Sequence, residues 1–319
     1  MWEMGAERAE GGAPEGEAEF VFLGTGVSTA LPRLDCVVRG DCAVCRKGYE
    51  DELNPNRRCN VSGVVRTAGG QCVMVDCGKT MREAVLRWFK RNGIHGVHAV
   101  LLTHDHADAT HGLDDLRELQ FRDRLHRPVD LAVHADGQTL SSLRKGFAYL
   151  FPREQPMGDI VRRVAHLNWV QLPEAFQTFT PVEGLRVTPV PLLHGGDYIC
   201  QGFVFGNAGG LVYLSDFHEV PEKTLEFLAS LPPIRVLVLD ALMRRPHPSH
   251  ASLEYSVGLA LRLRPAQAFF VGMSCVLGDH DACNKELAKK SDDDAAAHPD
   301  KPRVALALAH DGLKVHFPV

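Results

Sequence analysis

The segment that most constrains this chain is THDHADATHGLDDL, which begins at Thr103. It overlaps the end of the apolar run HAVLLTH, residues 98–104, and this run predicts a short buried strand. Residues two apart near the end of a strand can point the same way, so His104, His106 and Asp108 are expected to converge. Imidazole and carboxylate groups are the ligands that suit Zn²⁺ and neighbouring divalent ions. The pattern therefore predicts a metal site, and a histidine-rich polar loop without a metal is the alternative interpretation.

The overall composition is that of an ordinary globular chain. Of its 319 residues, 45% are hydrophobic and 24% are charged, which is enough apolar material to form a core. The formal net charge of −5 argues against nucleic acid or an anionic membrane as a partner, because such binders usually carry a basic surface. The chain has no run approaching about 18 consecutive apolar residues, which argues against a transmembrane helix.

The N-terminal segment is acidic, rich in glycine and alanine, and without the apolar core of a secretory signal. We expect residues 1–18 to be a disordered tail and residues 19–319 to form the folded domain. Nine cysteines is an odd count, and without an export signal it indicates a reducing compartment rather than a disulfide framework. We therefore expect a cytoplasmic protein whose thiols are free or bind metal.

Strand and helix patterns alternate along the rest of the chain. A hairpin is expected over 62–78, and helices over 79–93 and 112–125. The acidic run at 291–302 is expected to be a solvated loop. Two hairpin-rich halves interleaved with helices indicate an α/β protein with two packed sheets and helices outside. In the second half, strands are expected over 185–191, 199–206, 210–215, 235–239 and 267–272, and helices near 221–231, 251–263 and 281–290. A last strand or hairpin is expected over 303–318.

The metal-site segment resembles the HxHxDH signature of the metallo-β-lactamase superfamily, and further landmarks follow in the family's order over residues 19–319. LGTG near the N-terminus resembles the family's opening strand and turn. The resemblance implies a four-layer αββα sandwich. It also implies that Asp76 of VMVDCG orients the metal loop, that His194 of PLLHG is the third histidine ligand, and that Asp216 of VYLSD bridges two metals.

Within that superfamily, TGVSTALPRLDC, GLDDLR, LSDFHEVPEKTLEFL and VGMSC together resemble the phosphoribosyl cyclic phosphate phosphodiesterases of phosphonate breakdown. That branch carries a structural zinc on three cysteines of an N-terminal loop, here about residues 33–60, and one C-terminal histidine. Such a Cys₃His set is a closed tetrahedral site, and three free surface thiols are the alternative interpretation. Cys36 lies further from the next cysteine than in the bacterial form. The implied ligands are Cys36, Cys42, Cys45 and His280.

Two positions depart from the family pattern at the catalytic site. Ala109 stands where HxHxDH ends in a histidine that binds the second metal, and alanine has no ligand atom. Cys275 of VGMSC stands where the branch supplies its last histidine ligand, and a thiolate there would favour Zn²⁺ over Mn²⁺. The expected ligands are His104, His106, His194 and Asp216 for the first metal, and Asp108, Asp216 and Cys275 for a second one.

Such a site suits hydrolysis, because a divalent metal lowers the pKa of bound water from near 16 to about 7. The expected catalytic metal is zinc, with manganese as the alternative. Asp108 and Asp216 would take part in the reaction as ligands of the metals. A leaving alkoxide still needs a proton, and the resemblance implies that His250 of RRPHPSHASL is the general acid. His247 and His218 are lesser candidates, and helix capping or surface exposure is the structural alternative for His250.

The expected activity is a phosphodiesterase acting on a small cyclic phosphate or a nucleotide-like ester. A tRNA 3′-end-processing nuclease shares the fold, but the acidic charge and the lack of a long basic arm argue against it. Thioester or lactone hydrolases generally keep the histidine that Ala109 replaces. A degenerate metal-binding scaffold without catalysis is the alternative from another class. The branch resemblance also implies a homodimer formed near the zinc loop.

Overall fold

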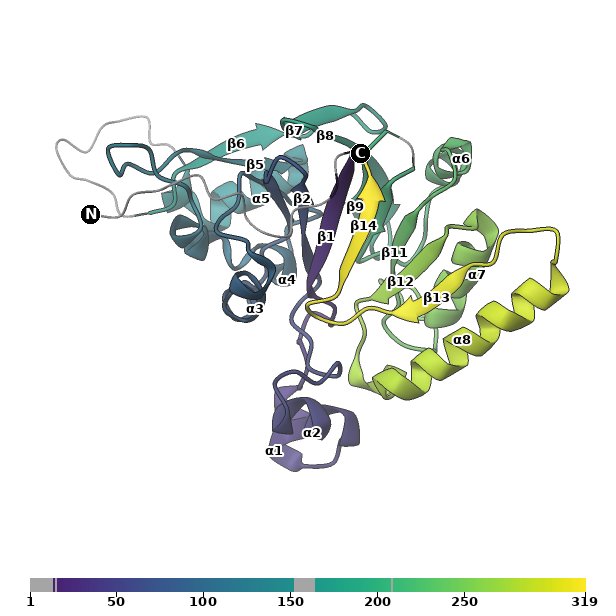
Figure 1. Ribbon diagram of the computed structural model, residues 1–319. Coiled ribbons are helices and arrows are strands. Elements are labelled where there is room, and N and C mark those ends of the chain that lie inside the picture. The colour runs from purple at the N-terminus through teal and green to yellow at the C-terminus, as the bar shows by residue number, and fades with distance from the viewer. Residues whose placement is uncertain (1–13, 15, 152–163, 208) are drawn as a thin grey trace.

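The computed structural model describes residues 14, 16–151, 164–207 and 209–319, and the statements below concern those residues. Their strands form two seven-stranded sheets that pack face to face, with helices on both outer faces (Figure 1). This arrangement confirms the four-layer αββα sandwich expected from the sequence.

The first sheet contains the strands of the N-terminal half together with the last strand of the chain. Its members are β1 (Glu17–Gly24), β2 (Ser62–Thr67), β3 (Cys72–Val75), β4 (Ala99–Leu101), β5 (Leu131–Ala135), β6 (Leu167–Gln171) and β14 (Lys314–Pro318). Their order across the sheet is β14-β1-β2-β3-β4-β5-β6. From β3 to β6 the strands run parallel, so their C-terminal ends lie along one edge of the sheet.

The second sheet contains the remaining strands of the C-terminal half. Its members are β7 (Phe179–Val182), β8 (Leu185–Leu193), β9 (Ile199–Phe205), β10 (Leu211–Leu214), β11 (Val236–Asp240), β12 (Gln267–Val271) and β13 (Ala305–Leu308). They lie in the order β13-β12-β11-β10-β9-β8-β7. The strands from β10 to β13 are parallel, and β8 runs in the same direction because β9 is antiparallel to both β8 and β10.

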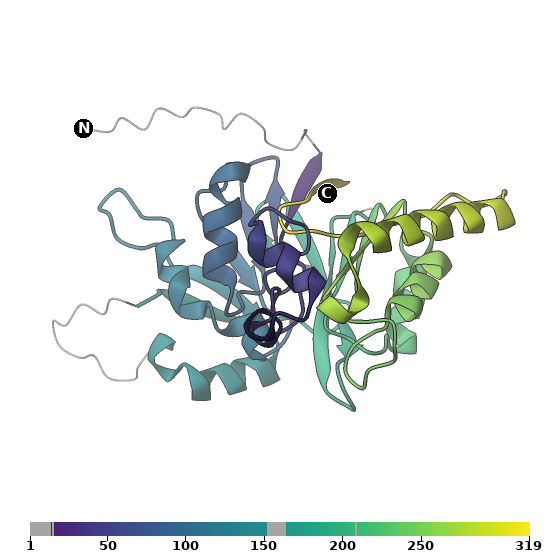
Figure 2. The ribbon, with the colours of Figure 1, turned by 90° about the horizontal axis from the view of Figure 1, so that it is seen from below.

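Helices cover the outer face of each sheet, and two of them project from the sandwich as a small lobe, α1 and α2 in Figure 1. Figure 2 shows this lobe from below, in front of the seam between the two halves. The α-helices are α1 (Leu34–Arg39), α2 (Ala43–Glu50), α3 (Met81–Trp88), α4 (Ala107–Thr110), α5 (Gly137–Gly146), α6 (Glu222–Ser230), α7 (Leu253–Leu263) and α8 (His280–Ala297). Short 3₁₀ helices are η1 (Lys90–Asn92), η2 (Leu113–Glu118), η3 (Ala148–Leu150) and η4 (Cys275–Leu277).

The burial pattern of β1 shows how the layers form. Phe20 and Phe22 point into the core between the sheets, whereas Val21 and Leu23 point into the core under the helices. Successive side chains of a strand alternate between faces, and both faces of this strand are covered, so the strand reads as a continuous apolar run. Burying each such side chain contributes about 1.5–3 kcal/mol.

Three expectations about the elements need correction. The expected tail of residues 1–18 falls largely on residues 1–13 and 15, which lie outside the described residues, but Glu17 and Ala18 pair with β14 and belong to the fold. The acidic run does not begin with a loop, because α8 continues to Ala297. Within it, the Ser291 hydroxyl donates to the Leu287 carbonyl and accepts from the Leu306 amide.

The helix expected over 112–125 is also shorter than predicted, because only η2 forms there. The chain then turns, and the Gln120 amide donates to the carbonyls of Val129 and His166. Side-chain bonds to backbone compete with the helical pattern at this point. None of the helices described here has the length and apolar character needed to cross a membrane.

Candidate metal centre

The candidate site lies where strands of both sheets end. Thr103 and His104 follow β4, and Asp76 follows β3 directly in the first sheet. From the second sheet, His194 follows β8 and Asp216 lies just beyond β10. Strands that run in one direction present their C-terminal ends at one edge, which is where open α/β sheets commonly place their ligand sites. Residues far apart in the sequence therefore meet at this edge.

Three histidines form the centre of the site, as the sequence predicted. One ring nitrogen of each of His104, His106 and His194 lies within 4.8 Å of the others. The Nε2 atom of His194 faces Nδ1 of His106 at 3.2 Å, and Nε2 of His104 is buried without a hydrogen-bond partner. Three imidazole nitrogens that converge in this way fit a tetrahedral Zn²⁺, for which Zn–N distances are about 2.0–2.1 Å.

The His104 ring is oriented by a buried relay. Asp76 accepts hydrogen bonds from the amide and the hydroxyl of Thr103, both at 2.8 Å, and the Thr103 hydroxyl lies 2.8 Å from Nδ1 of His104. A proton on Nδ1 then points to Thr103 and leaves Nε2 for a metal. Burial raises the pKa of Asp76 to about 8. Asp76 therefore reaches the His104 ring through Thr103, which is the route by which it would orient this histidine.

His194 is oriented by a backbone carbonyl instead. Its Nδ1 lies 2.8 Å from the carbonyl oxygen of Ser249, so Nε2 is again the nitrogen turned toward the other histidines. Burial, followed by the neighbouring His250, lowers the pKa of His194 to about 4. Burial also lowers the pKa of His104 well below its usual value. Both rings are thus neutral near pH 7, which is the form that binds a metal.

Beside the three histidines lies a second group made by Asp216, Asp240 and His250, whose ligand atoms are also within 4.8 Å of one another. Nδ1 of His250 is 2.7 Å from the Asp240 carboxylate and 3.7 Å from that of Asp216. The His194 and His250 rings are 4.9 Å apart between centroids. Burial opposes the charge on His250, but the carboxylate of Asp240 prevails and raises the pKa of His250 to about 9.

Asp240 was missed at the sequence level. It ends the apolar strand β11, VLVLD, in the same manner as Asp76 after VMV and Asp216 after VYLS. The repeated pattern of an apolar strand that runs into an aspartate was the signal that could have identified it. Asp240 is fully buried, and its Oδ1 has no hydrogen-bond partner among the described residues.

The two positions around the expected second metal differ in what they contribute. Asp108, on α4, lies close enough for its charge to add to the burial that raises the pKa of Asp216. Ala109 is buried, and its carbonyl accepts a hydrogen bond from the amide of Cys77. His111 is not one of the converging histidines, because its ring packs against Phe147 at 5.7 Å.

A third group consists of four cysteines, and it corrects two residue assignments. The Sγ atoms of Cys36, Cys42, Cys45 and Cys275 lie within 4.8 Å of one another, with 4.0 Å between those of Cys36 and Cys275. A tetrahedral Zn–S bond of about 2.3 Å places sulfur atoms about 3.8 Å apart, so the four thiols fit a zinc ion. Cys275 therefore belongs with the thiols and is not a ligand of the histidine centre.

His280, expected as the fourth ligand of the cysteine loop, is absent from this group. It begins α8, five residues beyond Cys275, and its Nδ1 and Nε2 lie 3.0 Å from Arg58 and 2.9 Å from Asn284. Cys275 begins η4, which packs its thiol against Leu31 and Cys45. The turn at η4 therefore brings Cys275, and not His280, to the α1–α2 lobe.

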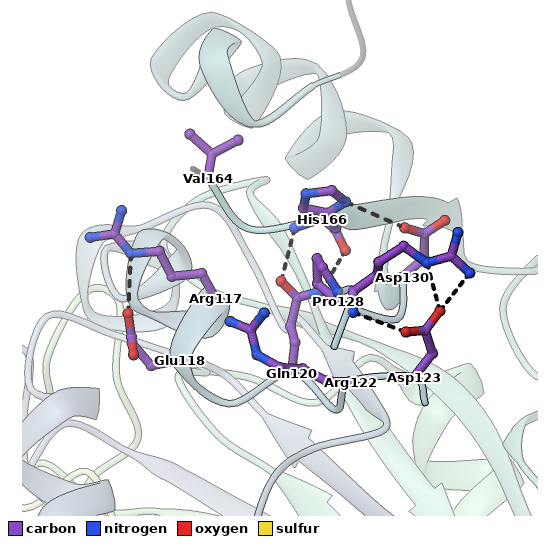
Figure 3. Close-up of a pocket in the computed structure, with 10 residues that line it drawn as sticks. Arg117, Glu118, Gln120, Arg122, Asp123, Pro128, Asp130, Val164 and His166 are labelled. Carbon is purple, nitrogen blue, oxygen red and sulfur yellow. Dashed lines mark hydrogen bonds and ion pairs between the residues drawn. The ribbon is translucent and has the colours of Figure 1, made fainter. Parts of the chain in front are cut away.

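A cavity of about 860 Å³ lies elsewhere on the first sheet (Figure 3). Asp130 and His166 line it, and they directly precede β5 and β6, so the cavity lies at the opposite end of these strands from the metal centre. Its wall includes the ion pair of Arg127 with Asp123 at 2.7 Å. The cavity is therefore separate from the histidine site.

Residues 71–273 match the model of the β-lactamase superfamily domain, which covers more than half of the chain. The chain belongs to the β-lactamase superfamily. A solved diphosphatase of the PhnP family resembles it with a TM-score of 0.74 and 29% identity, over 95% of this chain and 98% of that one. This likeness confirms the metallo-β-lactamase fold and the branch expected from the sequence.

Two solved structures with lower sequence identity share the architecture of this chain. Zinc-bound PqqB from Methylobacterium extorquens has a TM-score of 0.65 and 18% identity, over 93% of this chain and 99% of that one. Human short-form tRNase Z has a TM-score of 0.56 and 15% identity, over 94% of this chain and 100% of that one. At these identities the likeness shows the fold alone.

One curated protein matches this chain over only part of that protein's own length. An octanoyltransferase from Porphyromonas gingivalis (strain ATCC BAA-308 / W83) is 31% identical over 238 residues, or 74% of this chain. The match covers 42% of that protein, so the chain spans less than half the length of this relative. The family match and the diphosphatase structure agree on the metallo-β-lactamase fold for this chain.

Proposed function

We propose that this protein is a metal-dependent phosphodiesterase that hydrolyses a small cyclic phosphate or a nucleotide-like ester. The observation that carries the proposal is that the three-histidine group lies next to the group of Asp216, Asp240 and His250. Neutral His104 and His194 face a metal position, and the carboxylate-bound His250 lies next to them. One group suits activation of water and the other suits protonation of a leaving oxygen.

His104, His106 and His194 would hold the metal, together with the carboxylate of Asp216. The buried Nε2 of His104, without a partner, supports this assignment. A divalent ion bound there supplies Lewis acidity that activates water and polarises a phosphoryl oxygen. Imidazole ligands favour zinc over manganese, because Mn²⁺ prefers carboxylate and water ligands.

His250 is the proposed proton donor to the leaving alkoxide. Its Nδ1 is held at 2.7 Å by the buried carboxylate of Asp240, which leaves Nε2 as the nitrogen free to meet a substrate. The same carboxylate stabilises the imidazolium form, so the ring carries a proton to give. Asp240 thus orients and charges His250 without touching the substrate itself.

The solved diphosphatase of the PhnP family supports phosphoryl chemistry over acyl chemistry. The choice of a phosphodiester follows the resemblance of TGVSTALPRLDC and VGMSC to cyclic phosphate phosphodiesterases. The tRNA 3′-end nuclease alternative has less support, because its solved relative shares the fold at only 15% identity and the chain carries a net charge of −5. An acyl substrate is suggested only by the name of the octanoyltransferase.

We also propose that the four cysteines bind a structural zinc. Cys45 accepts a hydrogen bond from the amide of Arg33 at 3.4 Å, and Cys42 accepts one from the amide of Cys45 at 3.5 Å. Backbone amides that point at sulfur stabilise thiolate, the form that binds zinc. This ion would join the α1–α2 lobe to the turn after β12.

The test is hydrolysis of an aryl phosphodiester by the purified protein. Turnover should disappear with a chelator and return with zinc, and His250→Ala should lower it by about 10²-fold or more. His298→Ala, at the far end of α8, is the matched control and should leave turnover unchanged. A protein that binds metal but hydrolyses only thioesters, or no ester at all, would contradict the proposal.

A further inference from the structure

His106 differs from the other two histidines in how its ring is held. The rings of His104 and His194 each have a hydrogen-bond partner at Nδ1, whereas the His106 ring makes none among the described residues beyond its contact with His194. It is also the exposed member of the three. A ligating histidine ordinarily needs such a partner to fix its orientation. Something else must therefore hold the His106 ring.

Tyr198 supplies that support. Its ring stacks on the His106 imidazole with 5.3 Å between centroids and 13° between planes. The Tyr198 hydroxyl donates to the carboxylate of Asp105, the residue before His106, and the Asp105 amide approaches the same hydroxyl oxygen at 3.4 Å. Ser142 of α5 adds a hydrogen bond to the Asp105 carboxylate. The tyrosine thus contacts both the ring and the backbone of this ligand segment.

Tyr198 is itself tied to the third histidine. The His194 amide donates to the Tyr198 carbonyl at 2.8 Å, and the Tyr198 amide donates to the Gly195 carbonyl at 3.1 Å. Gly195 and Gly196 make this turn with φ values of 84° and 54°, which glycine adopts readily. The turn therefore places Tyr198 beside His194 while its ring reaches across to the other sheet.

We propose that Tyr198, together with Asp105, is a positioning residue that holds Nδ1 of His106 toward the metal and joins the two ligand loops. The proposal rests on the metal centre of the proposed function but not on the choice of substrate. Loss of the tyrosine ring frees an exposed imidazole, and loss of the hydroxyl frees the segment that carries it. Both losses weaken the metal site through His106.

The experiment measures zinc affinity by competition with a chelator. His104→Ala identifies which release step belongs to the histidine centre and which to the four cysteines. At the histidine step, Tyr198→Phe should weaken zinc binding about tenfold and Tyr198→Leu about 100-fold, the usual range for groups that orient a ligand. Asp105→Asn should resemble Tyr198→Phe. The cysteine step should not change in any of these variants.

Tyr149→Phe is the matched control, because it removes another tyrosine–aspartate hydrogen bond, to Asp114, outside the histidine centre. Its zinc affinity should equal that of the wild type. Circular dichroism should show that each variant is folded. Wild-type affinity in Tyr198→Phe and Asp105→Asn would overturn the proposal even if the wild type hydrolyses phosphodiesters. A wild type that lacks the histidine step altogether would overturn the metal centre itself.

Discussion

Nδ1 of His250 lies 2.7 Å from the fully buried carboxylate of Asp240, and this contact occupies one of the two ring nitrogens. The pair joins the end of β11 to the loop before α7. A histidine fixed in this way has one orientation and one remaining nitrogen for chemistry. The geometry makes Asp240 the partner through which His250 would act in the proposed reaction.

Asp240→Asn should therefore act on the same step as His250. We expect turnover of an aryl phosphodiester to fall by about 10-fold or more, because the amide no longer stabilises the imidazolium. In a double-mutant cycle, adding Asp240→Asn to His250→Gln should cause little further loss, since residues that act as a unit are not additive. Independent, additive losses in kcat would show that the two residues do not work together.

Metal content should separate the two candidate sites. Cys275→Ser should remove the zinc of the four cysteines and leave the histidine metal, whereas His104→Ala should do the reverse. Elemental analysis of the purified proteins gives the count. Cys283→Ser is the matched control, because this nearby buried thiol lies outside the cysteine group. If His280→Gln instead lost zinc as Cys275→Ser does, the assignment of Cys275 as the fourth ligand would be wrong.

His280 should make stability depend on pH. Burial, and then the charge of Arg58, lower the pKa of His280 to about 4. The unfolded chain binds a proton near pH 6.5 while the folded protein does not, so stability should fall as the pH drops from about 6.5 toward 4, by at most about 3 kcal/mol. Denaturant unfolding at several pH values measures this slope. His280→Gln should flatten it, and an unchanged slope would exclude His280 as its origin.

A side chain at Gly272 should be destabilising for two separate reasons, the backbone conformation and a steric clash. Its φ is 73°, and a Cβ atom there would lie 2.1 Å from Oδ1 of Asp240. Gly184 has a φ of 77° with nothing within 4 Å, so it carries the backbone strain alone. Gly184→Ala should cost about 1–2 kcal/mol and keep full activity. Gly272→Ala should cost about 1–3 kcal/mol more and lower turnover by displacing Asp240. Equal effects on activity would argue against this role.

Much of the histidine site followed from the sequence because its residues lie at strand ends. An apolar strand that runs into His104 and His106, or into Asp76, carries both its own burial and the position of the polar side chain in one local pattern. Such patterns can be recognised in a single sequence because they depend only on residues that are close together along the chain.

Other features had no local signal. Cys275 and His280 are both close to the same turn, and only the direction of η4 determines which of them reaches Cys36, 239 positions away in the sequence. In the continued part of α8, Asp294 pairs with the guanidinium of Arg264 at 2.8 Å, a contact from a distant segment. Contacts of this range depend on how whole elements pack, which a pattern along the chain does not record.

By itself, the sequence determined two packed sheets with outer helices and the cluster of His104, His106 and Asp108, since strand burial and strand ends are local properties. The four-layer αββα order, His194 and Asp216 followed from the family resemblance. The tertiary structure alone decided that Asp240 holds His250, that Tyr198 stacks on His106, and that Cys275 joins the cysteines. Each of these contacts joins segments that meet only after the sheets have packed. Their physical cause is the alignment of parallel strand ends at one edge, which brings distant side chains within bonding distance.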